Sequence, residues 1–228
     1  LSALELEKFS IKFAAGGSAA NSMIGLSQLG GDAAFGGKIG MDEHGIIYRK
    51  KLEELGVKAC LGQGDGATGS SLVLVSGKGD RTMNTFLGMC QDLEANDIDK
   101  EVIQSSEFMY LTGYLWDTES QKKTVMHTLL EAKNRGIKVA LSLSDPFCVT
   151  RHKKDFLKFM QEHVDLVFCN QEEIFTLLGT FYTQDALKII SKWTETVVLT
   201  MGEKGALIYH CGDMIYIDPL PVKVIDTT

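Results

Sequence analysis

The chain has 228 residues and a formal net charge of −7 at pH 7, with 23 Lys and Arg against 30 Asp and Glu. Its length and average polarity are those of a globular chain that buries a core without disulfides or structural metals. The acidic balance argues against a partner that is nucleic acid or a membrane surface, because proteins of those classes carry a basic stripe. It is compatible with a small phosphorylated ligand held by backbone N–H groups.

Short apolar runs alternate with amphipathic stretches in chain order. The runs are apolar on consecutive positions, which is typical of parallel strands buried on both faces. They are Ala33–Gly37, Phe108–Thr112, Lys138–Leu143, Leu166–Cys169 and Val197–Thr200. Apolar spacing and helix-ending residues predict helices over Ser18–Leu29, Glu43–Leu55, Thr118–Arg135, Arg151–His163, Gln171–Leu178 and Thr183–Lys192. The alternation predicts one α/β domain over residues 1–228, with a doubly wound, mostly parallel sheet sandwiched by helices.

One region interrupts this alternation. Gly56–Met89 has no helical pattern, and Leu72–Ser76 and Arg81–Phe86 flank a glycine-rich turn, which predicts a β-hairpin. With Val57–Leu61 as a third strand, residues 57–89 would form a small β-sheet lid that covers a ligand or pairs with a second subunit. A second hairpin is predicted over residues 205–217.

The five cysteines are widely spaced and form no C-x-x-C pair. This pattern indicates buried thiols in a reducing compartment, and it disfavours a disulfide framework or a zinc site. Near the N-terminus no basic flank precedes an apolar core, and no apolar run reaches the roughly 20 residues that cross a bilayer. We therefore expect a cytoplasmic protein. The five histidines likewise share no metal-ligand spacing.

The first candidate binding segment is Gly16–Asn21 at the start of the first helix. The pair Gly16 and Gly17 would let a ligand approach the backbone closely, and the helix N-terminus would direct free N–H groups at hydroxyls or an anion. Asn21 offers a donor and an acceptor suited to a sugar hydroxyl. Close helix packing, with Asn21 bonded to local backbone, explains the same residues equally well.

The second segment, Gly36–Gly45, follows a predicted strand. Ligands of open α/β sheets bind at such carboxyl ends. The segment lacks the spacing of a Walker A loop and of a dinucleotide fingerprint, which disfavours a dehydrogenase. We interpret Asp42 as a helix N-cap, and Lys38 remains a candidate ligand contact.

Two further segments follow later strands. Asn170 and Glu173 have the spacing of a capping box, and they could equally place a carboxylate and an amide around Mg²⁺, with Glu173 acting through water. Thr200, Gly202 and Gly205 either form a simple turn or expose N–H groups to a triphosphate. Asp145 ends another strand, with structural and functional interpretations equally open.

In this order, these residues resemble the ribokinase-like (PfkB) family of carbohydrate and nucleoside kinases. The first family signature matches Gly16-Gly17…Asn21…Leu29-Gly30, followed by Gly37-Lys38-Ile39-Gly40-Met41-Asp42…Gly45. The N-x-x-E motif matches Asn170…Glu173, and T-x-G-x-x-G matches Thr200…Gly202…Gly205. The stretches Arg81–Gly88 and Ser144–Phe147 look most like the bacterial adenosine-kinase-like branch.

The resemblance implies an α/β core with a β-sheet lid, ATP at the carboxyl edge of the sheet, and a sugar or nucleoside between core and lid. Gly16, Gly17, Asn21 and Lys38 would contact the substrate. Asn170, Thr200, Gly202 and Gly205 would bind the nucleotide, and Glu173 would organise Mg²⁺. Apart from the resemblance, the mixed apolar and polar faces of the Leu72–Phe86 hairpin suggest that it covers the substrate, forms a homodimer through the lid, or does both.

Two parts of the family pattern are missing. The chain begins at Leu1 without Met and ends at Asp226-Thr227-Thr228, where the second signature would continue through an anion hole to the aspartate base. The usual first strand, with its substrate-binding aspartate, is also absent. We therefore expect the chain to be part of a complete ATP-dependent kinase whose catalytic aspartate lies beyond Thr228. The alternative is a catalytically inactive, kinase-like module that binds a sugar or nucleoside.

Overall fold

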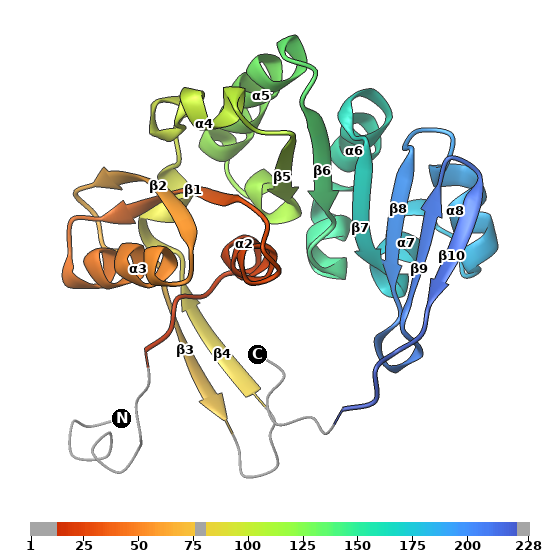
Figure 1. The fold of residues 1–228 in the computed structure, drawn as a ribbon, viewed down its shortest axis with the longest axis horizontal. Coiled ribbons are helices and arrows are strands. Elements are labelled where there is room, and N and C mark those ends of the chain that lie inside the picture. Colours follow the sequence, from red (N-terminus) through yellow and green to blue (C-terminus); the bar gives the residue numbers. More distant parts are fainter. Residues whose placement is uncertain (1–12, 76–80, 223–228) are drawn as a thin grey trace.

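The computed structural model describes residues 13–75 and 81–222. Its centre is a six-stranded sheet in the order β10-β9-β8-β7-β6-β5 (Figure 1). Strands β5 to β8 are parallel, and β9 and β10 continue the sheet antiparallel. The bounds are β5 Phe108–Thr112, β6 Lys138–Ser142, β7 Leu166–Asn170, β8 Thr196–Thr200, β9 Ala206–His210 and β10 Asp213–Ile217. The predicted α/β class with a mostly parallel sheet is confirmed.

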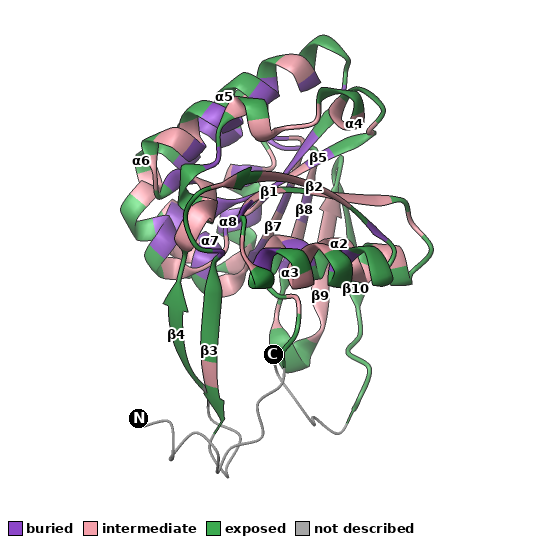
Figure 2. Ribbon diagram, turned by 90° about the vertical axis from the view of Figure 1, so that its left-hand side faces the viewer, coloured by how far each residue is buried: buried purple, intermediate pink, exposed green. Residues whose placement is uncertain are grey.

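Four helices bury one face of this sheet. They are α5 Glu119–Asn134, α6 Pro146–His163, α7 Gln171–Leu178 and α8 Thr183–Ile190, which Figure 2 shows together on one side. The core between them and the strands includes fully buried Leu129, Phe156 and Leu177. On the opposite face Phe168, Val198 and Ile208 form a half-buried row. Both faces of the sheet were predicted to be buried. Within the described residues, one face is fully buried and the other is half-buried.

The N-terminal part forms a smaller unit. It contains α2 Ser18–Gln28, β1 Ala33–Gly40, α3 Glu43–Glu54 and β2 Val57–Gly64. Strands β1 and β2 pair in parallel, and Ala20, Leu52 and Val57 form a small buried cluster beneath the helices. Short helical turns η1 Gly88–Asp92 and η2 Ala95–Asp97 and helix α4 Lys100–Gln104, none of which we predicted, lead to the central sheet.

Strands β3 Ser70–Val75 and β4 Arg81–Phe86 form an antiparallel ribbon that projects from this unit (Figure 1). The predicted hairpin is confirmed. Val57–Leu61 is not its third strand, because β2 pairs with β1 instead. In both views the ribbon extends on the same side as the turn that joins β8 to β9 (Figures 1 and 2).

Helix boundaries match the predicted ones closely, with one exception. Helix α6 begins at Pro146 rather than Arg151, because Asp145 caps it and proline fits a first turn. The helix has a kink at His152, with φ −114° and ψ 18°, next to the predicted start at Arg151. Within the described residues, no helix has the length and apolar character needed to span a membrane.

Candidate functional site

The turn from β7 into α7 places Asn170 and Glu173 at the carboxyl edge of the central sheet. The Asn170 Oδ1 accepts from the Glu173 N–H at 2.8 Å, and the Glu173 carboxylate accepts from the Asn170 N–H at 3.0 Å and from Asn170 Nδ2 at 2.8 Å. The predicted capping box is therefore present. It fixes the Glu173 carboxylate in one orientation at the start of the helix.

Glu173 is 5% exposed, and its electrostatic surroundings are unfavourable for a carboxylate. Burial raises the pKa of Glu173, the negative charges of Asp145 and Glu172 raise it further, and the Asn170 amide only partly opposes them. A cation beside Glu173 would relieve this accumulation of negative charge. Perturbed carboxyl groups of this kind are concentrated at functional sites.

Asp145 lies at the same edge, after β6. It caps α6 by accepting from the Cys148 N–H at 2.8 Å. Burial works to raise the pKa of Asp145, but hydrogen bonds from the Cys148 amide and the Tyr114 hydroxyl outweigh it, and the pKa is lowered. Asp145 therefore keeps its negative charge beside Glu173. Tyr114, which follows β5, was missed because nothing in its sequence context marks it as facing this edge.

Thr200 ends β8 directly opposite Asn170 in the strand register. Its Oγ1 lies 3.4 Å from the Cys169 carbonyl oxygen. Gly202 follows with φ +57°, and a Cβ built on it would have no heavy atom within 4 Å. The turn is therefore open at the position where the sequence predicts contact with a triphosphate.

Gly205 closes the same turn and makes a different contact. Its φ is +84°, and a Cβ there would collide with the Ile217 carbonyl oxygen. The Met201 N–H donates to the Gly205 carbonyl at 2.9 Å. Gly205 therefore shapes the turn through backbone packing, while Gly202 leaves the space open.

The turn from β1 into α3 is held by hydrogen bonds between Asp42 and Thr68. Asp42 accepts from the Gly45 N–H at 2.8 Å, the Thr68 N–H at 2.8 Å and the Thr68 hydroxyl at 2.5 Å, and Thr68 Oγ1 accepts from the Gly40 N–H at 2.9 Å. Hydrogen bonds from the Thr68 hydroxyl, the Thr68 amide and the Gly45 amide lower the pKa of Asp42 to about 2. The predicted N-cap is confirmed. It also ties the turn to the segment that enters the ribbon.

Lys38 lies on β1 and is engaged with acidic residues. Its side chain is 10% exposed, and Nζ lies 3.0 Å from Asp97 Oδ2 and 3.8 Å from Glu94 Oε2. The structure thus gives Lys38 protein partners, whereas the sequence left it as a ligand contact. Its role toward a substrate stays a prediction.

The N-terminus of α2 is open. Gly17 is its N-cap residue with φ +104° and no side-chain cap, so the first-turn N–H groups are available to a ligand. Asn21 is exposed in the next turn, and the Gly16 carbonyl accepts from the Tyr48 hydroxyl at 3.0 Å. Helix α2 belongs to the N-terminal unit and packs against β5.

The structure therefore separates the predicted residues into two groups. Asn170, Glu173, Thr200, Gly202 and Gly205 share one edge of the central sheet. Gly16, Gly17, Asn21 and Lys38 lie in the N-terminal unit, which the ribbon extends. No described hydrogen bond or ion pair joins the two groups directly.

The first group suits a nucleotide and Mg²⁺. Glu173 is a buried carboxylate in a negative environment, and both its oxygens already accept protein hydrogen bonds, so contact with Mg²⁺ through water is the arrangement that fits. The open Gly202 turn beside it leaves room for phosphate groups. The donor set is oxygen and backbone N–H, which is the chemistry that a magnesium–phosphate complex requires.

Comparisons with known proteins agree with this geometry. A family model described as pfkB family carbohydrate kinase matches residues 3–228. A protein called uncharacterized sugar kinase, from Archaeoglobus fulgidus, is 26% identical over 90% of this chain and 80% of its own length. The crystal structure of adenosine kinase from Sinorhizobium meliloti has a TM-score of 0.88 and 32% identity, and that of a probable sugar kinase protein from Rhizobium etli has 0.90 and 33%. Each of these two matches covers 99% of this chain and 70% of the other.

Proposed function

The chain belongs to the pfkB family of carbohydrate kinases and is a phosphotransferase acting on a sugar or nucleoside, and we propose that it uses ATP and Mg²⁺ to phosphorylate a hydroxyl of that substrate. The proposal rests on the residues that lie together at the carboxyl edge of the central sheet. There Glu173, Asn170 and Thr200 adjoin the open turn at Gly202. These groups suit a polyphosphate with its cation better than they suit a neutral ligand.

At this edge each group has a separate task. Glu173 would hold a water of the Mg²⁺ shell, and Asn170 fixes the orientation of its carboxylate. The Thr200–Gly205 turn would present hydroxyl and N–H groups to the phosphates. Bound at this edge, Mg²⁺ would supply positive charge to the phosphate oxygens of the nucleotide. The protein would position the phosphoryl group in line with the attacking hydroxyl and would stabilise the negative charge of the phosphates.

The acceptor would lie between the two units. The open N-terminus of α2, with Gly17 and Asn21, offers N–H and amide groups to substrate hydroxyls. The β3–β4 ribbon projects on the side of the nucleotide edge, where it could cover a bound acceptor (Figure 1). The similarity to an adenosine kinase at 32% identity supports including nucleosides among the candidate acceptors.

The test is turnover of ATP by the full-length protein with Mg²⁺ and a panel of adenosine, ribose and fructose. We expect ADP and one phosphorylated acceptor in equal amounts. ATP binding and acceptor binding without turnover of any hydroxyl compound would instead support the inactive binding module. Removal of Mg²⁺ by a chelator should abolish turnover, and its return should restore it.

A further inference from the structure

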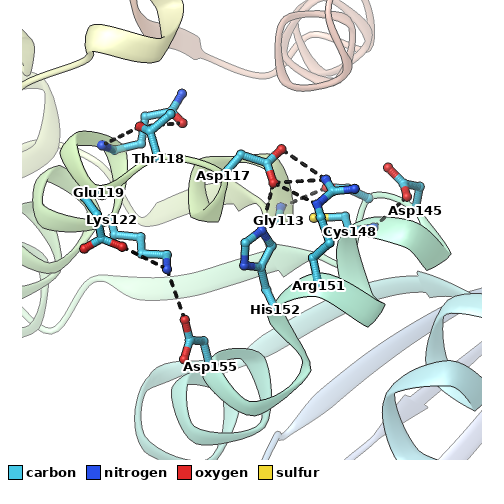
Figure 3. Close-up of polar contacts among 12 residues, drawn as sticks. Gly113, Asp117, Thr118, Glu119, Lys122, Asp145, Cys148, Arg151, His152 and Asp155 are labelled. Carbon is cyan, nitrogen blue, oxygen red and sulfur yellow. Dashed lines mark hydrogen bonds and ion pairs between the residues drawn. The ribbon is translucent and has the colours of Figure 1, made fainter.

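A second cluster of ligand-type side chains lies one helical turn away from the capping residue Asp145. Asp117, Cys148 and His152 each present one donor atom, and these three atoms lie within 4.8 Å of one another. Figure 3 shows the three side chains pointing toward one another, with Arg151 against Asp117. The set combines a carboxylate oxygen, a thiol sulfur and an imidazole nitrogen.

The fold places these groups from two elements. Asp117 follows the short helix η3 Gly113–Trp116, which comes directly after β5. Cys148 and His152 are four residues apart on α6, a spacing that puts two side chains on one helical face. The cysteine and histidine spacings predicted no zinc site, because the third residue of the cluster comes from a different segment of the chain.

Aromatic packing holds the two elements together. The Trp116 ring lies edge-on to Phe156 and Phe159, with ring centroids 5.2 and 4.8 Å away. All three rings are buried in the main core. The residue before Asp117 is therefore anchored on the same helix that carries Cys148 and His152, and the three donors are held together before any ligand arrives.

From this arrangement we propose that Asp117, Cys148 and His152 bind a divalent transition-metal ion, with Zn²⁺ as the chemical type. A thiolate and an imidazole select zinc-like ions over Mg²⁺ and Ca²⁺, which take oxygen ligands. Three protein ligands leave a fourth position for water. Tetrahedral bonds of about 2.0–2.3 Å put donor atoms roughly 3.3–3.8 Å apart, so small side-chain shifts complete the site.

Binding exchanges existing contacts for metal bonds. In the metal-free protein Asp117 Oδ1 lies 2.8 Å from His152 Nε2, and Arg151 contacts Asp117 at 3.0 and 3.2 Å. The metal takes the Asp117 oxygen and the imidazole nitrogen, the buried Cys148 thiol gives its proton to a water that arrives with the metal, and Arg151 is released. The Arg151 side chain is 50% exposed, so it can turn into water.

The site uses different residues from the proposed Mg²⁺ position. Cys148 and Glu173 follow different strands, and the Glu173 carboxylate is held by Asn170. The proposed Mg²⁺ position offers oxygen donors alone, whereas the second cluster combines one carboxylate oxygen with a sulfur and a nitrogen. The proposal therefore stands or falls independently of ATP turnover.

The experiment is a titration of the full-length protein with Co²⁺, followed by absorption spectroscopy, in a Cys211→Ser background that removes the exposed thiol. We expect one equivalent to bind with a thiolate-to-cobalt charge-transfer band, and Zn²⁺ to displace it. Cys148→Ser should abolish the band, and His152→Gln or Asp117→Asn should weaken Co²⁺ binding at least about 10-fold. Cys60→Ser, which changes a half-buried thiol elsewhere, is the matched control and should leave the band unchanged.

A second variant keeps the proposal testable if Cys148→Ser does not fold. Arg151→Gln removes the cation that competes for Asp117, so a metal site predicts tighter Co²⁺ binding. A cluster that only forms ion pairs predicts no bound metal in either protein. Absence of the band at one equivalent, or its survival in Cys148→Ser, would overturn the proposal.

Discussion

Asp42 and Glu173 are both acidic residues at the start of a helix that follows a strand, yet their electrostatic surroundings differ. Asp42 accepts three hydrogen bonds from Gly45 and Thr68, and they lower its pKa to about 2. Glu173 is buried beside Asp145 and Glu172, and its pKa is raised. The protein itself satisfies the first acid, which makes it structural. The second accepts hydrogen bonds only from Asn170, and its surroundings disfavour its charged form, which a bound cation would favour.

The largest expected effect on the free energy of unfolding concerns the turn between β1 and α3, which Asp42 and Thr68 stabilise. A Cβ at Gly40 would collide with the Gly66 carbonyl oxygen and lie 2.7 Å from the Thr68 N–H nitrogen, so the strand end and the ribbon entry would be forced apart. Gly40→Ala should lower the free energy of unfolding by roughly 2–3 kcal/mol, measured by urea denaturation. In the control Gly25→Ala, nothing lies within 4 Å of the new Cβ. That variant should be stabilised by about 0.5–1 kcal/mol, since alanine favours helices. Equal destabilisation of both variants would show that the close packing at Gly40 does not stabilise this turn.

Glu173→Gln tests the second of the two acidic residues, the one that we assign to binding. It removes the negative charge that we assign to the Mg²⁺ shell while keeping the size of the side chain. Activity, as kcat/KM for Mg·ATP, should fall roughly 10–100-fold. Glu172→Gln, in the same helical turn but exposed, is the matched control and should change activity little. A Glu173→Gln enzyme as active as the Glu172→Gln enzyme would remove Glu173 from the proposed site.

The pH dependence of stability should carry the signature of Asp42. Because its pKa is lowered from 3.8 to about 2, its stabilising contribution is present above pH 3.8 and is lost as pH falls toward 2. Asp42→Asn should therefore flatten the stability profile in this acidic window. Unfolding midpoints measured between pH 2 and 5 for both proteins check this, and parallel profiles would count against it.

The smallest stability effect is expected in the ribbon. Leu72 is 53% exposed, so Leu72→Ala should change the free energy of unfolding by less than about 0.5 kcal/mol. If the ribbon covers the acceptor, KM for the acceptor should nevertheless rise. Leu130→Ala, an exposed leucine on α5, should change neither quantity. Sedimentation of the wild type and of Leu72→Ala separates loss of ligand cover from loss of a second subunit.

Strand and helix positions were predictable wherever the pattern is local. The strand Phe108–Thr112 and the helix Gln171–Leu178 lie where the apolar runs indicated. The pairing of Val57–Gly64 with β1 was not predictable, because strand partners depend on long-range contacts. The first residues of α6, Pro146–Thr150, were likewise not predicted, although Asp145 and Pro146 are typical of a helix start.

Site residues divide in the same way. Asn170 and Glu173 could be found because a capping box and a family motif share a spacing within one turn. Tyr114 and the Asp117–Cys148–His152 cluster could not, since their members come from separate segments that meet only in the folded chain. The five cysteines were expected to be buried. Cys148 and Cys169 are buried, Cys60 and Cys90 are only partly buried, and Cys211 is exposed in the turn between β9 and β10.

The most direct test is to measure Mg·ATP affinity by calorimetry for the wild type, Asp42→Asn and Glu173→Gln under one neutral, low-temperature condition. The account predicts that Glu173→Gln loses affinity while retaining its unfolding midpoint. Asp42→Asn should retain affinity while unfolding more easily. Loss of Mg·ATP binding in Asp42→Asn together with unchanged binding in Glu173→Gln would contradict the assignment of the two turns.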